Sequence, residues 1–179
     1  MKTDPARRRV PQAILVGIIA GAISAIVKFG WEVPLPPRTP ERNATNPPQQ
    51  LLQQLGFSES FTHQTYTYLG NHMPWVSFIV HFAFAIGFAV IYCVLAEYYP
   101  RIKMWQGVVF GLGVWVVFHL ILMPAFGTVP APWHQPFGEH FSEALGHAVW
   151  MWIIEIVRRD LRNRITHEPD AEFPLTSRA

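Results

Sequence analysis

Residues 74–96 read PWVSFIVHFAFAIGFAVIYCVLA, an apolar run without a single Asp, Glu, Lys or Arg. An α-helix needs about 20 mostly apolar residues to cross the ~30 Å hydrocarbon core of a bilayer. Three further stretches have a similar length and character: residues 11–29, 105–126 and 138–157. The sequence therefore predicts an all-α fold, a four-helix transmembrane bundle that forms a single polytopic membrane domain over residues 1–179.

Positive charge alternates along the chain with these apolar stretches. Ten of the 14 Lys and Arg residues fall in three segments, which are Lys2 with Arg7–Arg9, Arg101 with Lys103, and Arg158, Arg159, Arg162 and Arg164. Cytoplasmic loops carry the excess of Lys and Arg in membrane proteins. The pattern predicts that both termini are cytoplasmic (N-in/C-in), with an outer loop at 31–73 and a disordered cytoplasmic tail at 168–179.

Composition excludes several classes of function. The net charge of +2 is explained by orientation in the membrane, so the lipid bilayer is the expected partner and nucleic acid is not. No nucleophile elbow, phosphate-binding loop, dinucleotide fingerprint or HExxH motif is found. We therefore expect no enzymatic activity and no cofactor.

Small side chains recur every fourth residue in the first apolar stretch, at Ala13, Gly17, Gly21 and Ala25. Such a stripe lies on one helix face and allows another backbone to approach closely. We interpret it as a surface for helix packing within the chain. The sequence leaves two other interpretations of the stripe open. It could form a homo-oligomer, or it could bind a partner in a larger membrane complex.

Histidines occur at similar depths in three of the four stretches. At ~1.5 Å per helical residue, His81, His119 and His147 lie about 10–13 Å below the outer ends of their helices. Glu143 precedes His147 by one turn, on the same helix face. The candidate proton-linked or ligand-binding residues are His81, His119, His140, Glu143, His147 and Lys28.

Placing an ionisable group in hydrocarbon costs free energy unless the group faces the bundle interior. These residues therefore suggest a functional site. Histidine changes its charge near neutral pH, and an adjacent carboxylate favours imidazolium, which suits a proton sensor or relay. The same donors can ligate zinc, nickel or ferrous iron. A third interpretation is structural, with neutral histidines forming hydrogen bonds between helices. The sequence leaves all three open.

Several long strings carry a resemblance to a known family. They are Lys28–Arg38, Tyr92–Glu97 with Ile102–Gly107, and Ser142–His147 with Arg158–Asp170. On these strings the chain resembles the YagU-type bacterial inner membrane proteins, although its first outer loop looks shorter and lacks cysteine. The resemblance implies a multi-pass inner membrane protein of undefined biochemical activity, linked to tolerance of acid, and it supplies no catalytic residue.

The predicted function is therefore a role in acid-stress response through the His/Glu residues of the outer half. A small transporter, a metal-binding membrane protein and an accessory subunit of a membrane complex are the alternatives.

Overall fold

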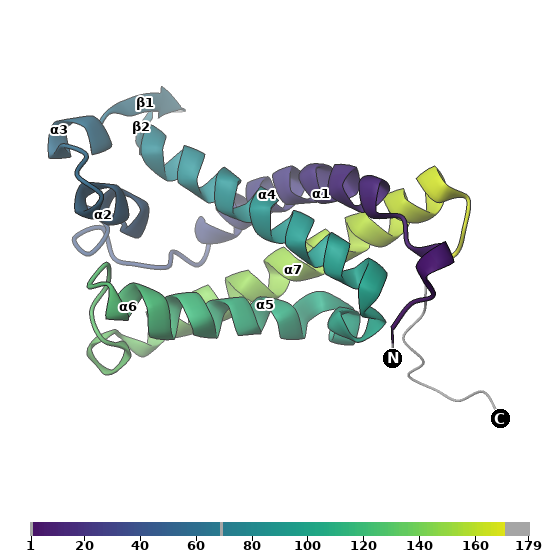
Figure 1. Ribbon diagram of the computed structural model, residues 1–179. Coiled ribbons are helices and arrows are strands. Elements are labelled where there is room, and N and C mark those ends of the chain that lie inside the picture. Colours follow the sequence, from purple (N-terminus) through teal and green to yellow (C-terminus); the bar gives the residue numbers. More distant parts are fainter. Residues whose placement is uncertain (1, 69, 171–179) are drawn as a thin grey trace.

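The computed structural model describes residues 2–68 and 70–170, and most of them are helical. The main helical segments are α1 (Val10–Glu32), α4 (Trp75–Tyr98), α5 (Val108–Trp115), the π-helical turn η3 (Val116–Leu122), α6 (Met123–Ala125) and α7 (Phe137–Thr166). The shorter elements are η1 (Pro5–Arg7), α2 (Pro47–Gln54), α3 (Glu59–Thr62), β1 (Thr65–Tyr68), β2 (Asn71–Pro74), η2 (Pro100–Gly107) and η4 (Pro132–His134). In Figure 1, α2, α3 and the strands gather at one end of the long helices, and the N-terminus and the end of α7 lie at the other.

Within the described residues, three helical segments are long and apolar enough to cross a membrane. They are Val10–Glu32, Trp75–Tyr98 and Pro100–Ala125, with mean hydropathies of 2.2, 2.5 and 2.2. These three segments agree with the first three stretches found in the sequence. The fourth stretch lies in α7, which has 30 residues and carries buried charged side chains.

A β-hairpin corrects the all-α prediction to a mostly helical fold. Strands β1 and β2 pair antiparallel, with Thr65 opposite Pro74 and Tyr68 opposite Asn71. Thr and Tyr favour extended backbone, and Gly70 takes the positive φ of +80° in the turn. The Tyr66 ring lies 4.4 Å from that of Trp75, so the hairpin packs on the start of α4.

Three boundaries differ from those expected. The third helix begins at Val108 instead of 105, because Trp105, Gln106 and Gly107 adopt left-handed φ values of 50°, 53° and 82°. Helix α7 continues past 157 to Thr166. Within the predicted tail, residues 168–170 make ion pairs with the helical body, and residues 171–179 lie outside the described residues.

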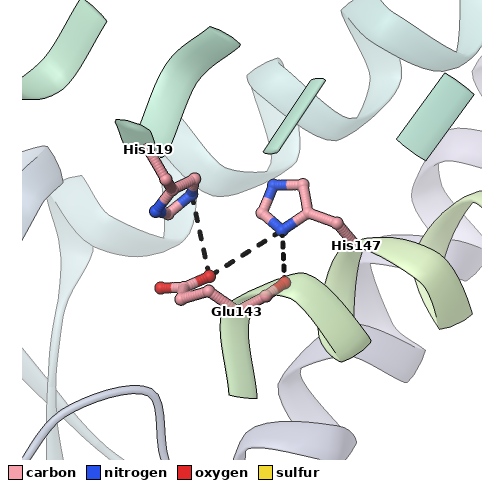
Figure 2. Close-up of side chains that lie close together, drawn as sticks. All are labelled: His119, Glu143 and His147. Carbon is pink, nitrogen blue, oxygen red and sulfur yellow. Dashed lines mark hydrogen bonds and ion pairs between the residues drawn. The ribbon is translucent and has the colours of Figure 1, made fainter. Parts of the chain in front are cut away.

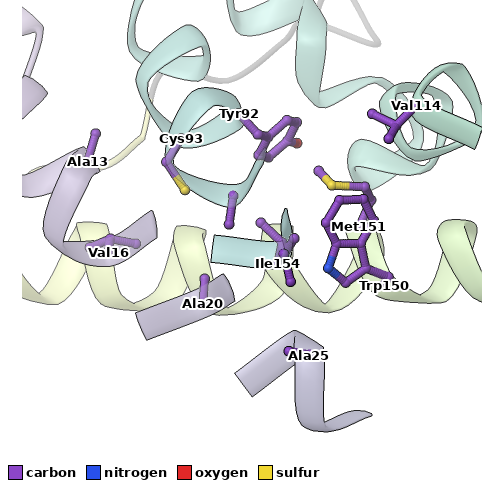
Figure 3. Close-up of a cluster of buried hydrophobic side chains, with 12 residues drawn as sticks. Ala13, Val16, Ala20, Ala25, Tyr92, Cys93, Val114, Trp150, Met151 and Ile154 are labelled. Atoms are coloured by element: carbon purple, nitrogen blue, oxygen red, sulfur yellow. The ribbon is translucent and has the colours of Figure 1, made fainter. Parts of the chain in front are cut away.

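The small-residue stripe of α1 faces α4. Ala13, Gly17, Gly21 and Ala25 are buried, and a Cβ added to Gly17 or Gly21 would lie 2.6 Å or 2.5 Å from the Cα of Val90 or Ile86. On the other side of the core, a Cβ on Gly111 would lie 2.5 Å from the His147 carbonyl oxygen. The apolar core fills the space between these contacts and includes Tyr92, Trp150, Met151 and Ile154 (Figure 3).

Candidate functional site

The structure brings three of the candidate residues together in a group that we call the His/Glu cluster: His119, Glu143 and His147. One potential ligand atom from each lies within 4.8 Å of the others. Figure 2 shows both imidazole rings beside the Glu143 carboxylate. Glu143 and His147 are buried and His119 is half-buried, so the cluster lies inside the protein.

Local structure explains how two helices supply these side chains. Glu143 and His147 are one turn apart on α7 and therefore share a face. His119 lies in η3, where the helix widens to a π-helical turn. Such turns are rare and often occur at functional sites. The His119 and His147 rings meet edge to face, with centroids 4.8 Å apart.

The backbone fixes the hydrogen-bonding state of His147. Its Nδ1 donates to the Glu143 carbonyl oxygen at 2.8 Å, and in Figure 2 its other ring nitrogen points away from the Glu143 side chain. When the ring is neutral, that second nitrogen carries the lone pair. The second ring nitrogen of His147 can therefore accept a hydrogen bond.

Two cations from outside α5 and α7 neutralise the Glu143 carboxylate. Lys28 Nζ of α1 lies 3.7 Å from Oε2, and Arg38 Nη2 lies 3.4 Å from Oε1. Lys28 also donates a hydrogen bond of 2.7 Å to Glu32. Two carboxylates and two permanent cations therefore balance one another when both imidazoles are neutral.

One oxygen of this carboxylate has no hydrogen bond. Glu143 Oε2 is buried without a hydrogen-bond partner among the described residues. Its nearest charged or titratable neighbours are Lys28 Nζ and His119 Nε2, each at 3.7 Å, and His147 Nδ1 at 3.8 Å. This oxygen has lost its hydration without gaining a hydrogen bond, so it offers an acceptor position to a donor group, a water molecule or an ion.

Two of the predicted residues lie apart from the cluster. His81 Nε2 donates to the Ala25 carbonyl oxygen of α1 at 3.2 Å, and its ring packs 4.2 Å from that of Phe29. His140 Nε2 donates to the Pro132 carbonyl oxygen at 2.8 Å. Each of these histidines forms a hydrogen bond to a backbone carbonyl oxygen, as expected of a structural residue. Lys28, in contrast, joins the cluster as expected.

Sequence reasoning missed Arg38 and Glu32 at this site. Glu32 follows Lys28 by four residues, a spacing that signals an ion pair on a helix. Arg38 gives no such signal, because it approaches Glu143 only after a proline-rich turn reverses the chain. A hydrogen bond of 2.7 Å from Ser142 Oγ to the Leu35 carbonyl oxygen fixes this turn against α7.

A second polar network lies at the opposite end of the helices. Arg162 binds Glu97 at 2.6 Å, and Arg158 binds Glu155 at 2.6 Å. Glu155 also accepts a hydrogen bond of 2.9 Å from the Tyr92 hydroxyl. These contacts connect α4 to α7, and they give Glu97 and Glu155 a structural role.

Comparison with known proteins agrees with the membrane character of the chain. The chain is 44% identical to "Inner membrane protein YagU" of Escherichia coli (strain K12), in an alignment that covers 98% of this chain and 97% of that protein. No solved structure matches. The family described as "Protein of unknown function (DUF1440)" matches residues 22–156. Because the match covers most of the chain, this membrane protein belongs to the DUF1440 family.

Proposed function

We propose that this protein is a multi-pass inner membrane protein that supports survival in acid by binding protons at the His/Glu cluster. The observation that carries the proposal is the unpartnered Glu143 Oε2, enclosed by three nitrogen atoms at 3.7–3.8 Å. A proton held between this oxygen and His119 Nε2 would supply the missing hydrogen bond. The function is binding and release of protons, without enzymatic turnover.

The charge balance favours a proton over a divalent metal ion. The two carboxylates, Glu32 and Glu143, are already balanced by Lys28 and Arg38. One proton adds one charge, whereas a divalent ion would leave two uncompensated charges in a buried region where charge is expensive.

Four crossings and cytoplasmic termini form part of the proposal. Helix α7 runs antiparallel along α1: its first part meets the end of α1, where Gly146 lies against Trp31, and its last part meets the start of α1, where Arg162 donates to the Arg7 carbonyl oxygen. At ~1.5 Å per residue, both helices are long enough to cross. A membrane that α1 crosses would therefore also be crossed by α7, with the basic segments on the cytoplasmic side.

The experiment is an acid-survival assay on cells that express Glu143→Gln or His147→Gln at matched protein level. Glu143→Gln keeps the size of the carboxylate, His147→Gln keeps a polar side chain, and each removes one titratable group. We therefore expect survival at low external pH to fall by more than any change in melting temperature in detergent explains. Glu41→Gln, an exposed carboxylate in the outer loop, is the matched control and should behave as wild type.

Two outcomes would reject the proton site. The first is normal survival of both variants. The second is loss of survival only in proportion to lost stability and abundance, which is the result expected if the cluster is purely a set of structural hydrogen bonds.

A metal-binding function is the second candidate, because one potential ligand atom from each of two imidazoles and a carboxylate lies within 4.8 Å of the others. It predicts that the purified protein retains stoichiometric metal and that His119→Ala loses it. Elemental analysis checks this, and a metal-free preparation that still restores acid survival would exclude it.

A further inference from the structure

We propose that the protein binds a small carboxylate anion in a pocket over Arg38. The pocket has a volume of about 150 Å³ and is lined by Arg38, Arg42, Thr45, Pro47, Thr128, Val129 and Pro130. It lies at the same end of the bundle as the His/Glu cluster. Sites for drug-sized ligands occupy about 300–1,000 Å³, so this pocket suits only a small ligand.

Arg38 is the residue in the pocket that is ready to receive an anion. A guanidinium has five N–H donors in a planar fork that matches a carboxylate. Among the described residues, the contact of Arg38 is one ion pair of 3.4 Å with Glu143 Oε1, longer than a charge-assisted hydrogen bond. Most of its donor capacity therefore remains available to a ligand.

The other arginine differs in this respect. Arg42 pairs with Glu139 through both Nε and Nη2, and this pairing raises the pKa of Arg42. A guanidinium occupied by a bidentate carboxylate contributes positive potential but few donors. One available guanidinium favours a singly charged carboxylate over a multiply charged phosphate.

The test is calorimetric titration of the purified full-length protein in detergent with sodium formate, which stays ionised from about pH 8 to about pH 5.5. We expect formate to bind, and to bind more tightly than inorganic phosphate.

Variants of Arg38 test whether this residue holds the anion. Arg38→Gln should weaken formate binding about tenfold or more, because it removes a charged donor. Arg38→Lys keeps the charge beside Glu143 and therefore the fold, but loses the planar fork, so it should also bind more weakly than wild type. Arg101→Gln removes an equal charge from an exposed position in η2 and should leave binding unchanged.

Absence of formate binding, equal binding by both Arg38 variants and wild type, or tighter binding of inorganic phosphate would overturn the carboxylate pocket. The pocket does not depend on the proposed proton site, so these outcomes leave that proposal standing. Normal acid survival of Glu143→Gln cells would instead reject the proposed function and leave the pocket standing.

Discussion

Gly21 of α1 allows α1 and α4 to pack closely because its side chain is only a hydrogen atom. A Cβ at this position would lie 2.5 Å from the Ile86 Cα, 3.0 Å from the Ala85 carbonyl oxygen and 3.1 Å from the Ala89 Cβ. The neighbouring atoms are mostly backbone, which cannot rotate away as a flexible side chain can. Any larger residue must therefore push α1 away from α4.

We predict that Gly21→Ala lowers the stability of the protein by about 1–3 kcal/mol, the usual cost of overpacking. Gly87→Ala is the matched control, because Gly87 lies on the exposed side of α4 and its Cβ would meet nothing within 4 Å. There the higher helix propensity of alanine should leave stability equal or raise it by about 0.5–1 kcal/mol. Thermal melting in detergent compares the two, and equal melting temperatures would show that the α1–α4 contact is loose.

At the scale of the element, the end of α7 is held by the residues that follow it. Asp170 binds Lys103 of η2 at 2.7 Å and also pairs with Arg158 of α7, while Glu168 binds Arg9 at 2.5 Å. Burial opposes ionisation of Asp170, but the charges of Arg158 and Lys103 outweigh it and hold its pKa below the usual value. The segment after α7 thus connects α7 to the turn between α4 and α5.

We predict that Asp170→Asn destabilises the protein by about 1–3 kcal/mol at neutral pH, because it removes a charged hydrogen-bond acceptor. A carboxyl whose pKa is depressed on folding contributes stability above its unfolded pKa of about 3.9 and loses it as pH falls through the folded value. The difference in melting temperature should therefore shrink in strong acid. Asp160→Asn, at an exposed i,i+4 pair with Arg164, should have little effect at any pH, and an equal effect of both variants would argue against the Asp170 contacts.

At the scale of the whole molecule, the direction of α7 decides how many times the chain crosses the bilayer. The three apolar segments place the start of α7 at the end of the bundle that holds α2, α3 and the hairpin. The length of α7 and its contacts along α1 place its last turns at the opposite end. The proposed four crossings would put Glu59 and Arg164 on different sides of the membrane.

We predict that a membrane-impermeant maleimide labels Glu59→Cys in intact spheroplasts and labels Arg164→Cys only after lysis. Both substitutions are made in a Cys93→Ala background, since Cys93 is the only cysteine, and both sites are exposed. Labelling of both positions in intact cells would show three crossings. Labelling of Arg164→Cys alone would show the inverted orientation.

Local sequence patterns were sufficient to predict the helical class, the three apolar helices and most of their limits. Apolar length is a local property, so the predicted stretch 11–29 is observed as α1 (Val10–Glu32). Glu143 and His147 were predicted to share a face because one helical turn separates them.

Only the tertiary structure decided which polar groups meet. His81, His119 and His147 were expected at one depth, yet His81 turns to the α1 backbone while the π-helical turn accompanies the contact of His119 with α7. Depth along a helix follows from counting residues, but direction around it depends on how the helices pack. The contact of Arg38 with Glu143, 105 positions apart, needs a chain reversal that no local pattern encodes. The composition of the site is thus a property of the packed bundle.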